Sequence, residues 1–87
     1  MKVQILVARN LRRLRVKQGL SQEALAVDAG IDRTYVSRLE RALENPTVGI
    51  LDRLSGALSV DICEFFDRTA VGRGPVKPLP SGRRKRT

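Results

Sequence analysis

The residues with the most evident chemistry are the hydrogen-bond donors crowded into residues 33–38. Val36 and Leu39 lie three residues apart, so a helix here would have one apolar side and would leave the donors on the other. Because an arginine can bond two acceptors at once, this pattern indicates an external partner rich in acceptors. The donors are Arg33, Thr34, Tyr35, Ser37 and Arg38.

The inventory of reactive side chains excludes most other chemistry. The chain has no histidine and one cysteine, Cys63, so zinc clusters, disulfide frameworks and Cys/His nucleophile pairs cannot be built. It also has no Gly-rich phosphate loop and no clustered carboxylates, so no catalytic constellation can be assembled. We expect a protein that is not an enzyme, without metal, cofactor or small-molecule ligand, in which Cys63 is inert and half-buried.

Positive charge is concentrated at the C-terminal end. Residues 1–70 hold 11 Lys/Arg against 9 Asp/Glu, a balance of +2, whereas residues 71–87 hold 6 Lys/Arg and no acid. This tail has many prolines and glycines and no apolar periodicity, so we expect it to be disordered. It is either a solvated arm or a source of nonspecific phosphate contacts. No apolar run approaches the roughly 20 residues of a membrane span.

The elements that position the donors can be read from helical spacing and caps. Apolar residues at i, i+4 and i+7 predict a first helix over about 4–18, ended by Gly19. Ser21, Asp32 and Thr47 are N-cap residues for helices at about 22–29, 33–41 and 48–58. Asp61 opens a short fifth helix in which Phe65 and Phe66 must face different ways. The prediction is an all-α domain of five short helices over 1–70, followed by the basic tail 71–87.

Residues 22–41 form a unit of two helices joined by a tight turn. Ala26 is small enough for a close helix approach, and Gly30 allows the positive φ that such a turn needs. The apolar residues of this unit would face the core, leaving Arg33, Thr34, Ser37 and Arg38 near the outer N-terminal end of its second helix. A major groove admits a helix of this kind. The acceptors indicated by the donors are therefore the base edges and phosphates of double-stranded DNA.

The segment GLSQEALAVDAGIDRTYVSRLER resembles the helix-turn-helix of Cro and phage-repressor-like (XRE-type) regulators of bacteria and phages. The resemblance runs from about Val7 to Phe66. The sequence pattern DRTY…ER..ENPT is also similar to that of restriction–modification controller proteins. It implies base reading by Arg33, Thr34, Ser37 and Arg38, and phosphate contacts from Gln22, Tyr35 and Arg41. It also implies a structural ion pair between Arg15 and Glu40, although Arg15 could instead touch DNA. One departure is Arg41-Ala42-Leu43, where many relatives have a glycine.

The resemblance implies a cytoplasmic transcription regulator that binds a pseudo-palindromic operator as a homodimer, with helices 4 and 5 at the dimer contact. Two alternatives keep the DNA chemistry: a restriction–modification controller, or the antitoxin of a toxin–antitoxin pair. A third, of another class, is a protein-interaction module that has the same fold and has lost base reading.

Overall fold

A computed structural model of the chain describes residues 2–72, without side-chain detail at 71 and 72. The predicted disorder of the basic tail therefore falls, from residue 73 on, outside the described residues. Within 2–72 the secondary structure is entirely helical, with no strand. The elements in chain order are α1 (Val3–Lys17), α2 (Gln22–Ala29), α3 (Arg33–Glu40), α4 (Val48–Leu58), the 3₁₀ helix η1 (Ile62–Phe66) and α5 (Arg68–Gly72).

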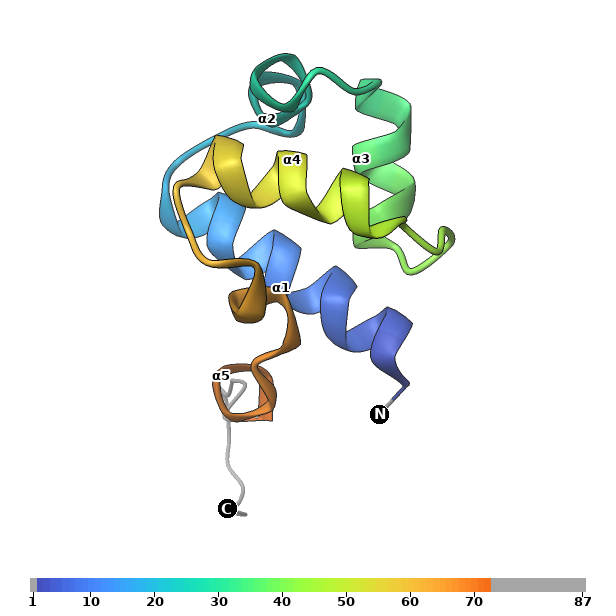
Figure 1. Ribbon diagram of the computed structural model, residues 1–87, viewed down its shortest axis with the longest axis vertical. Coiled ribbons are helices and arrows are strands. Elements are labelled where there is room, and N and C mark those ends of the chain that lie inside the picture. The colour runs from blue at the N-terminus through green and yellow to red at the C-terminus, as the bar shows by residue number, and fades with distance from the viewer. Residues whose placement is uncertain (1, 73–87) are drawn as a thin grey trace.

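The helices pack in two connected groups (Figure 1). The helix α2 contacts α3 and α4, whereas α1 contacts α3, η1 and α5. Figure 1 also shows α3 standing along one side of the domain, joined to α2 by a short turn. The helix-turn-helix unit is thus held against the rest of the domain from two directions.

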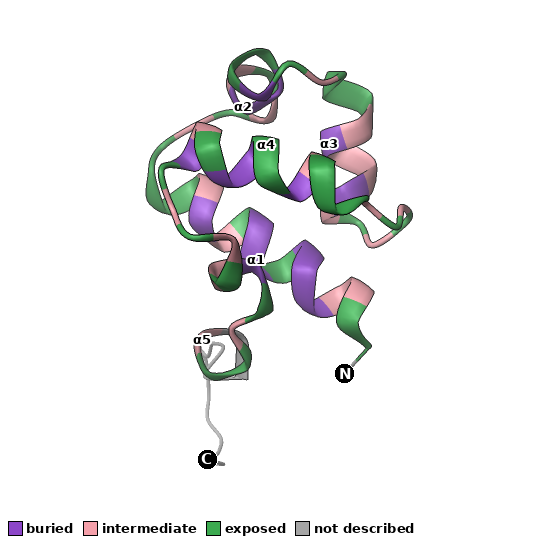
Figure 2. Cartoon of the chain, in the orientation of Figure 1, coloured by how far each residue is buried: buried purple, intermediate pink, exposed green. Residues whose placement is uncertain are grey.

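A core of aliphatic side chains and the Phe65 ring joins these elements. Its most deeply buried members are Leu25, Val36, Leu54, Leu58 and Phe65, each 0% exposed. Figure 2 shows that the buried positions of α1, α3 and α4 face inward, while the N-terminal end of α3 is exposed. Replacing any one of these large side chains with alanine would cost about 2–5 kcal/mol.

The four N-caps predicted from the sequence are all present. The side chains of Ser21, Asp32, Thr47 and Asp61 each accept a hydrogen bond from a backbone N–H two or three residues ahead. Each cap satisfies a donor that the helix itself leaves unpaired and contributes about 1 kcal/mol. The predicted α-helix bounds hold to within one residue for α1, α2, α3 and α4.

The C-terminal part of the domain differs from the prediction in two ways. The segment after Asp61 is a 3₁₀ helix, not an α-helix, and it is followed by an additional short helix, α5. Because α5 ends at Gly72, helical structure passes the predicted boundary at residue 70. Phe65 is fully buried and Phe66 is 43% exposed, so the expectation that the two rings face different ways is confirmed.

Candidate nucleic-acid interface

The turn between α2 and α3 sets the direction of the donor-bearing helix. Gly30 ends α2 at φ 71° and ψ 35°, a left-handed conformation that costs a glycine nothing sterically. The N–H of Ile31 donates to the Ala26 carbonyl at 3.0 Å, and Ala26 is 3% exposed. The Asp32 carboxylate then accepts from the N–H of Thr34 at 2.9 Å. These bonds fix where α3 begins and which side of it faces outward.

The outward side of α3 carries the predicted base-reading residues. Val36 and Leu39 are 0% and 2% exposed and anchor the inner side. Arg33, Thr34 and Arg41 are exposed, and Ser37 and Arg38 are partly exposed. Within residues 2–72, the Arg33 guanidinium has no hydrogen bond or ion pair. The helix therefore presents a continuous polar face to solvent.

A buried carboxylate ties this helix to the first two. Arg15 donates to Glu40 from Nε at 2.6 Å and from Nη2 at 3.0 Å, and its Nη1 donates to the Leu20 carbonyl at 2.7 Å. Gln22 donates from Nε2 to the same Glu40 Oε1, at 3.1 Å. The hydrogen bond to Glu40 raises the pKa of Arg15, against an opposing effect of burial. Arg15 and Glu40 thus form the predicted ion pair, and Gln22 is held at the start of α2 by one of its two amide hydrogens.

Arg38, expected to read a base, is bonded within the protein. Its Nε donates to Glu44 Oε2 at 2.6 Å, and its Nη2 lies 3.4 Å from the Leu43 carbonyl oxygen. Partial burial, and then the charge of Glu44, raise the pKa of Tyr35. Glu44, for which no role was predicted, therefore acts on two of the predicted DNA contacts, through a hydrogen bond from Arg38 and through its charge at Tyr35.

The loop after α3 follows a path that the sequence alone left open. Ala42 stands at φ 60°, in the left-handed region that glycine adopts without strain, so its methyl group is accepted there at a cost of about 1 kcal/mol. Gln4 from the start of α1 donates from Nε2 to the carbonyls of Ala42 at 2.8 Å and Glu44 at 3.1 Å. This amide holds the loop against α1. The residues near Gln4 in the sequence do not predict this contact.

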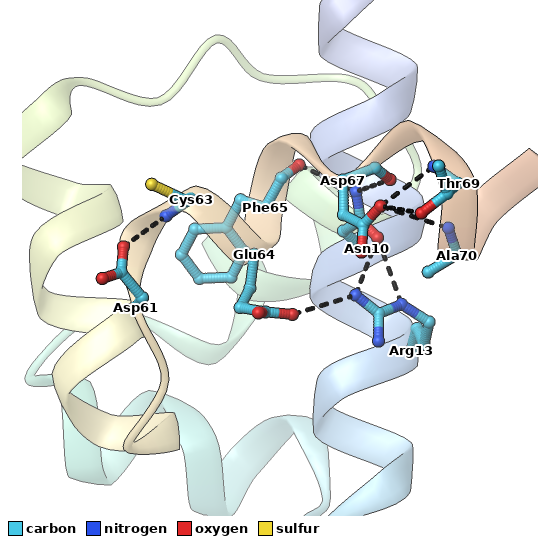
Figure 3. Close-up of polar contacts among 9 residues, drawn as sticks. All are labelled: Asn10, Arg13, Asp61, Cys63, Glu64, Phe65, Asp67, Thr69 and Ala70. Carbon is cyan, nitrogen blue, oxygen red and sulfur yellow. Dashed lines mark hydrogen bonds and ion pairs between the residues drawn. The ribbon is translucent and has the colours of Figure 1, made fainter.

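A second missed residue, Asn10, joins α1 to the C-terminal elements (Figure 3). Its side chain is completely buried and donates from Nδ2 to the carbonyls of Phe65 at 2.9 Å and Asp67 at 3.0 Å. Its Oδ1 accepts from Arg13 at 3.1 and 3.0 Å, and Arg13 lies 3.7 Å from Glu64. The available signal was the place of an asparagine three residues from Val7 and four from Leu14, on the apolar side of α1.

The side chain of Cys63 was predicted to be half-buried, and it is exposed on η1. The prediction of a half-buried side chain was therefore wrong, because this residue lies on the outer side of the 3₁₀ helix while Phe65 occupies the inner side. The hydrogen bond and charge of Asp61 raise the pKa of the Cys63 thiol, so it stays protonated at neutral pH and is a poor nucleophile. Among residues 2–72 no group of side chains could hold a metal ion, and no helix there is long and apolar enough to cross a membrane.

The chain is similar to known transcriptional regulators and control proteins in sequence. Its residues 11–65 match the family model HTH_3, described as helix-turn-helix. The control protein C.BamHI of Bacillus amyloliquefaciens is 32% identical over 71 residues, which cover 80% of this chain and 88% of that protein. A regulator of Bacillus subtilis, SlrR, is 36% identical over 63 residues, but the match spans only 41% of its length.

Solved structures of controller proteins are also similar to this chain in fold. The restriction–modification controller C.AhdI of Aeromonas hydrophila superposes with a TM-score of 0.71 at 38% identity, covering 72% of this chain and 96% of the controller. The neighbours also include structures of a further controller, C.Esp1396I. One is a tetramer in complex with its natural 35-base-pair operator, at a TM-score of 0.70 and 32% identity, covering 76% of this chain and 87% of that one. Others are variants in which an arginine, a threonine or a tyrosine at three consecutive positions is replaced.

Proposed function

Since the chain belongs to the helix-turn-helix family that its residues 11–65 match, we propose that it is a sequence-specific, double-stranded-DNA-binding transcription regulator. The observation that carries this proposal is the outward face of α3, where Arg33, Thr34 and Ser37 lie on the side opposite the buried Val36 and Leu39. A helix that is anchored on one side and covered with donors on the other fits the major groove, where each base pair offers its own pattern of acceptors.

The division of labour follows the position of each side chain. Arg33, Thr34, Ser37 and Arg38 contact base edges, whereas Gln22, Tyr35 and Arg41 contact phosphates. Gln22 suits a phosphate because it lies at the start of α2, where backbone N–H groups and the helix dipole favour an anion. The consecutive Arg33, Thr34 and Tyr35 have the same types, in the same order, as the three positions changed in the C.Esp1396I variants.

We further propose that it acts as a homodimer on a pseudo-palindromic site, with two copies of α3 in successive grooves about 34 Å apart. The predicted fourth and fifth helices of the dimer contact correspond to α4 and η1. The half-exposed Phe66 on η1 is the side chain that a second copy would cover. The operator complex of the C.Esp1396I tetramer supports the assembly of more than one copy on DNA. A regulator of this kind works where the DNA is, so we place it in the bacterial cytoplasm.

Within the family, a restriction–modification controller is the favoured role. The chain covers 88% of C.BamHI and 96% of C.AhdI, whereas it matches only 41% of SlrR. The motif DRTY…ENPT also resembles these controllers. Such a controller would regulate by occupancy of its site and respond to its own concentration.

The experiment is selection of bound duplexes from a random DNA pool at near-physiological salt. The full chain and a 1–72 truncation are used in parallel, because a cut at residue 70 would divide α5. We expect both to enrich the same two-fold-symmetric site, with the truncation showing a flatter dependence of affinity on salt. Binding without enrichment, lost with the tail, would contradict the proposal and would make the fold a protein-interaction module.

A further inference from the structure

The loop from Arg41 to Thr47 is held by side chains from two different helices. Gln4 of α1 donates to the carbonyls of Ala42 and Glu44. Arg38 of α3 bonds the Glu44 carboxylate and approaches the Leu43 carbonyl. Three consecutive loop residues are therefore tied to the helices, and Glu44 is tied twice, through its backbone and through its carboxylate.

The pair with Glu44 limits how Arg38 can meet a ligand. A guanidinium has five N–H groups, one on Nε and two on each Nη. Glu44 occupies Nε, and Leu43 faces one hydrogen of Nη2. The unused hydrogens lie on Nη1 and Nη2, at the end of a side chain that is 43% exposed. Arg38 can therefore approach a partner with its distal edge, whose two parallel N–H groups match the O6 and N7 acceptors of guanine.

The Arg38–Glu44 pair also changes the net charge of the outward face of α3. Glu44 is an acid on a surface that faces a polyanion, and a carboxylate without a cation there would repel phosphates. Arg38 cancels that charge at 2.6 Å, and its own charge is in turn withheld from the phosphates. Burial, and then the charge of Glu44, raise the pKa of Tyr35, so the carboxylate also acts on a second residue of this surface.

We propose that Glu44 is a specificity-determining positioning residue: it orients Arg38 for an end-on contact with one base pair and keeps Arg38 from binding phosphates indiscriminately. This inference rests on the proposed function, because it requires α3 to read DNA. It assigns a role in DNA recognition to a residue outside the helix-turn-helix, and it predicts that specific and nonspecific affinity change in opposite directions when Glu44 is altered.

The test is the variant Glu44→Gln, which keeps the size of the side chain and removes its charge. Preference at one base pair of each half-site should fall about tenfold, the size of one bidentate arginine contact. Affinity for unrelated duplex should rise, and its log–log salt slope should steepen by about 0.9 for each released arginine. The matched control is Asp52→Asn, the same charge change at an exposed position of α4, which should leave the preference unaltered.

A double-variant cycle shows whether the effect passes through Arg38. In an Arg38→Ala background, Glu44→Gln should no longer alter the base preference, since there is no guanidinium left to position. A loss of preference that persists in this background would overturn the inference, because Glu44 would then act on the DNA directly. Circular dichroism and thermal melting of each variant establish that the domain remains folded.

The outcomes distinguish a failure of the proposed role of Glu44 from a failure of the proposed DNA-binding function. If the unaltered chain enriches a two-fold site and Glu44→Gln enriches the same site with equal preference, only the positioning role of Glu44 is wrong. If the unaltered chain enriches no site, the proposed function fails and the role of Glu44 fails with it.

Discussion

Gln22 and Glu40 meet across the helix-turn-helix, with Nε2 of the amide 3.1 Å from the Oε1 that also accepts from Arg15. The residue expected to touch a phosphate is therefore oriented by the carboxylate at the end of α3. This contact joins the start of one helix to the end of the next, so the two predicted DNA-facing segments are positioned as one unit.

Replacing Arg15 with Ala should lower the free energy of unfolding by about 3 kcal/mol, because Glu40 would keep a buried charge without its cation. The Glu40 side chain is only 4% exposed. Urea unfolding followed by circular dichroism measures the loss. The double variant Arg15→Met with Glu40→Leu should recover most of the lost free energy of unfolding. If this double variant is as unstable as Arg15→Ala, the loss comes from packing and not from charge.

Replacing Gln22 with Ala should weaken DNA binding equally on preferred and unrelated sequences, with no change in salt slope, since the lost phosphate contact is neutral. Arg41→Ala should also act on every sequence, but it should flatten the slope by about 0.9 for each protomer. Fluorescence anisotropy over a salt series separates the two. A change of preferred sequence in Gln22→Ala would place this amide at a base edge.

Replacing Arg33 with Ala should cost about 1–3 kcal/mol on the preferred site and relax the preference at one base pair of each half-site. The exposed Arg33 guanidinium has no competing partner in residues 2–72, so the loss comes from DNA contacts alone. Repeating the selection with the variant gives the result. An equal loss on all sequences would reduce Arg33 to a phosphate contact.

Replacing Asn10 with Ala should destabilise the domain by about 2–3 kcal/mol, because the buried carbonyl of Phe65 and that of Asp67 lose their donor. Thr69→Ala, which removes an exposed bond to Asp67 at 2.6 Å, should cost well under 1 kcal/mol. Urea midpoints of both variants provide the comparison. Equal losses would mean that water replaces the Asn10 amide.

Replacing Ala42 with Gly should raise the free energy of unfolding by about 0.5–1 kcal/mol, because a left-handed backbone at φ 60° strains a side chain but not glycine. Ala57→Gly, in the last turn of α4 where Ala57 also packs against the core, should lower it by about 1 kcal/mol. Thermal melting of both proteins checks the opposite signs. Destabilisation by Ala42→Gly would show that this loop does not hold the left-handed turn in solution.

Sequence reasoning succeeded where the signal is local. Ser21, Asp32 and Thr47 cap helices through a backbone N–H two or three residues away, and Gly30 adopts the turn conformation open to glycine. These features depend on a few neighbouring residues, so periodicity and side-chain type suffice to predict them.

Contacts between residues that are far apart in the sequence were not predicted. Gln4 finds its acceptors 38 and 40 residues away, and Asn10 finds its own 55 and 57 residues away. Nothing in the residues near Gln4 or Asn10 specifies those partners. The Arg38–Glu44 pair spans six residues, yet it depends on the left-handed turn at Ala42, which the side-chain type disfavours.

The long-range bond of Asn10 also constrains the order in which the chain can complete its fold during synthesis. The first helix leaves the ribosome early, but the carbonyls that satisfy its buried amide belong to Phe65 and Asp67. A nascent chain that stops short of these residues has a polar group in its core with no acceptor, and it also lacks the Phe65 ring. Final consolidation of the domain therefore awaits translation of Phe65 and Asp67, so the surface of α3 is complete only after these residues have left the ribosome.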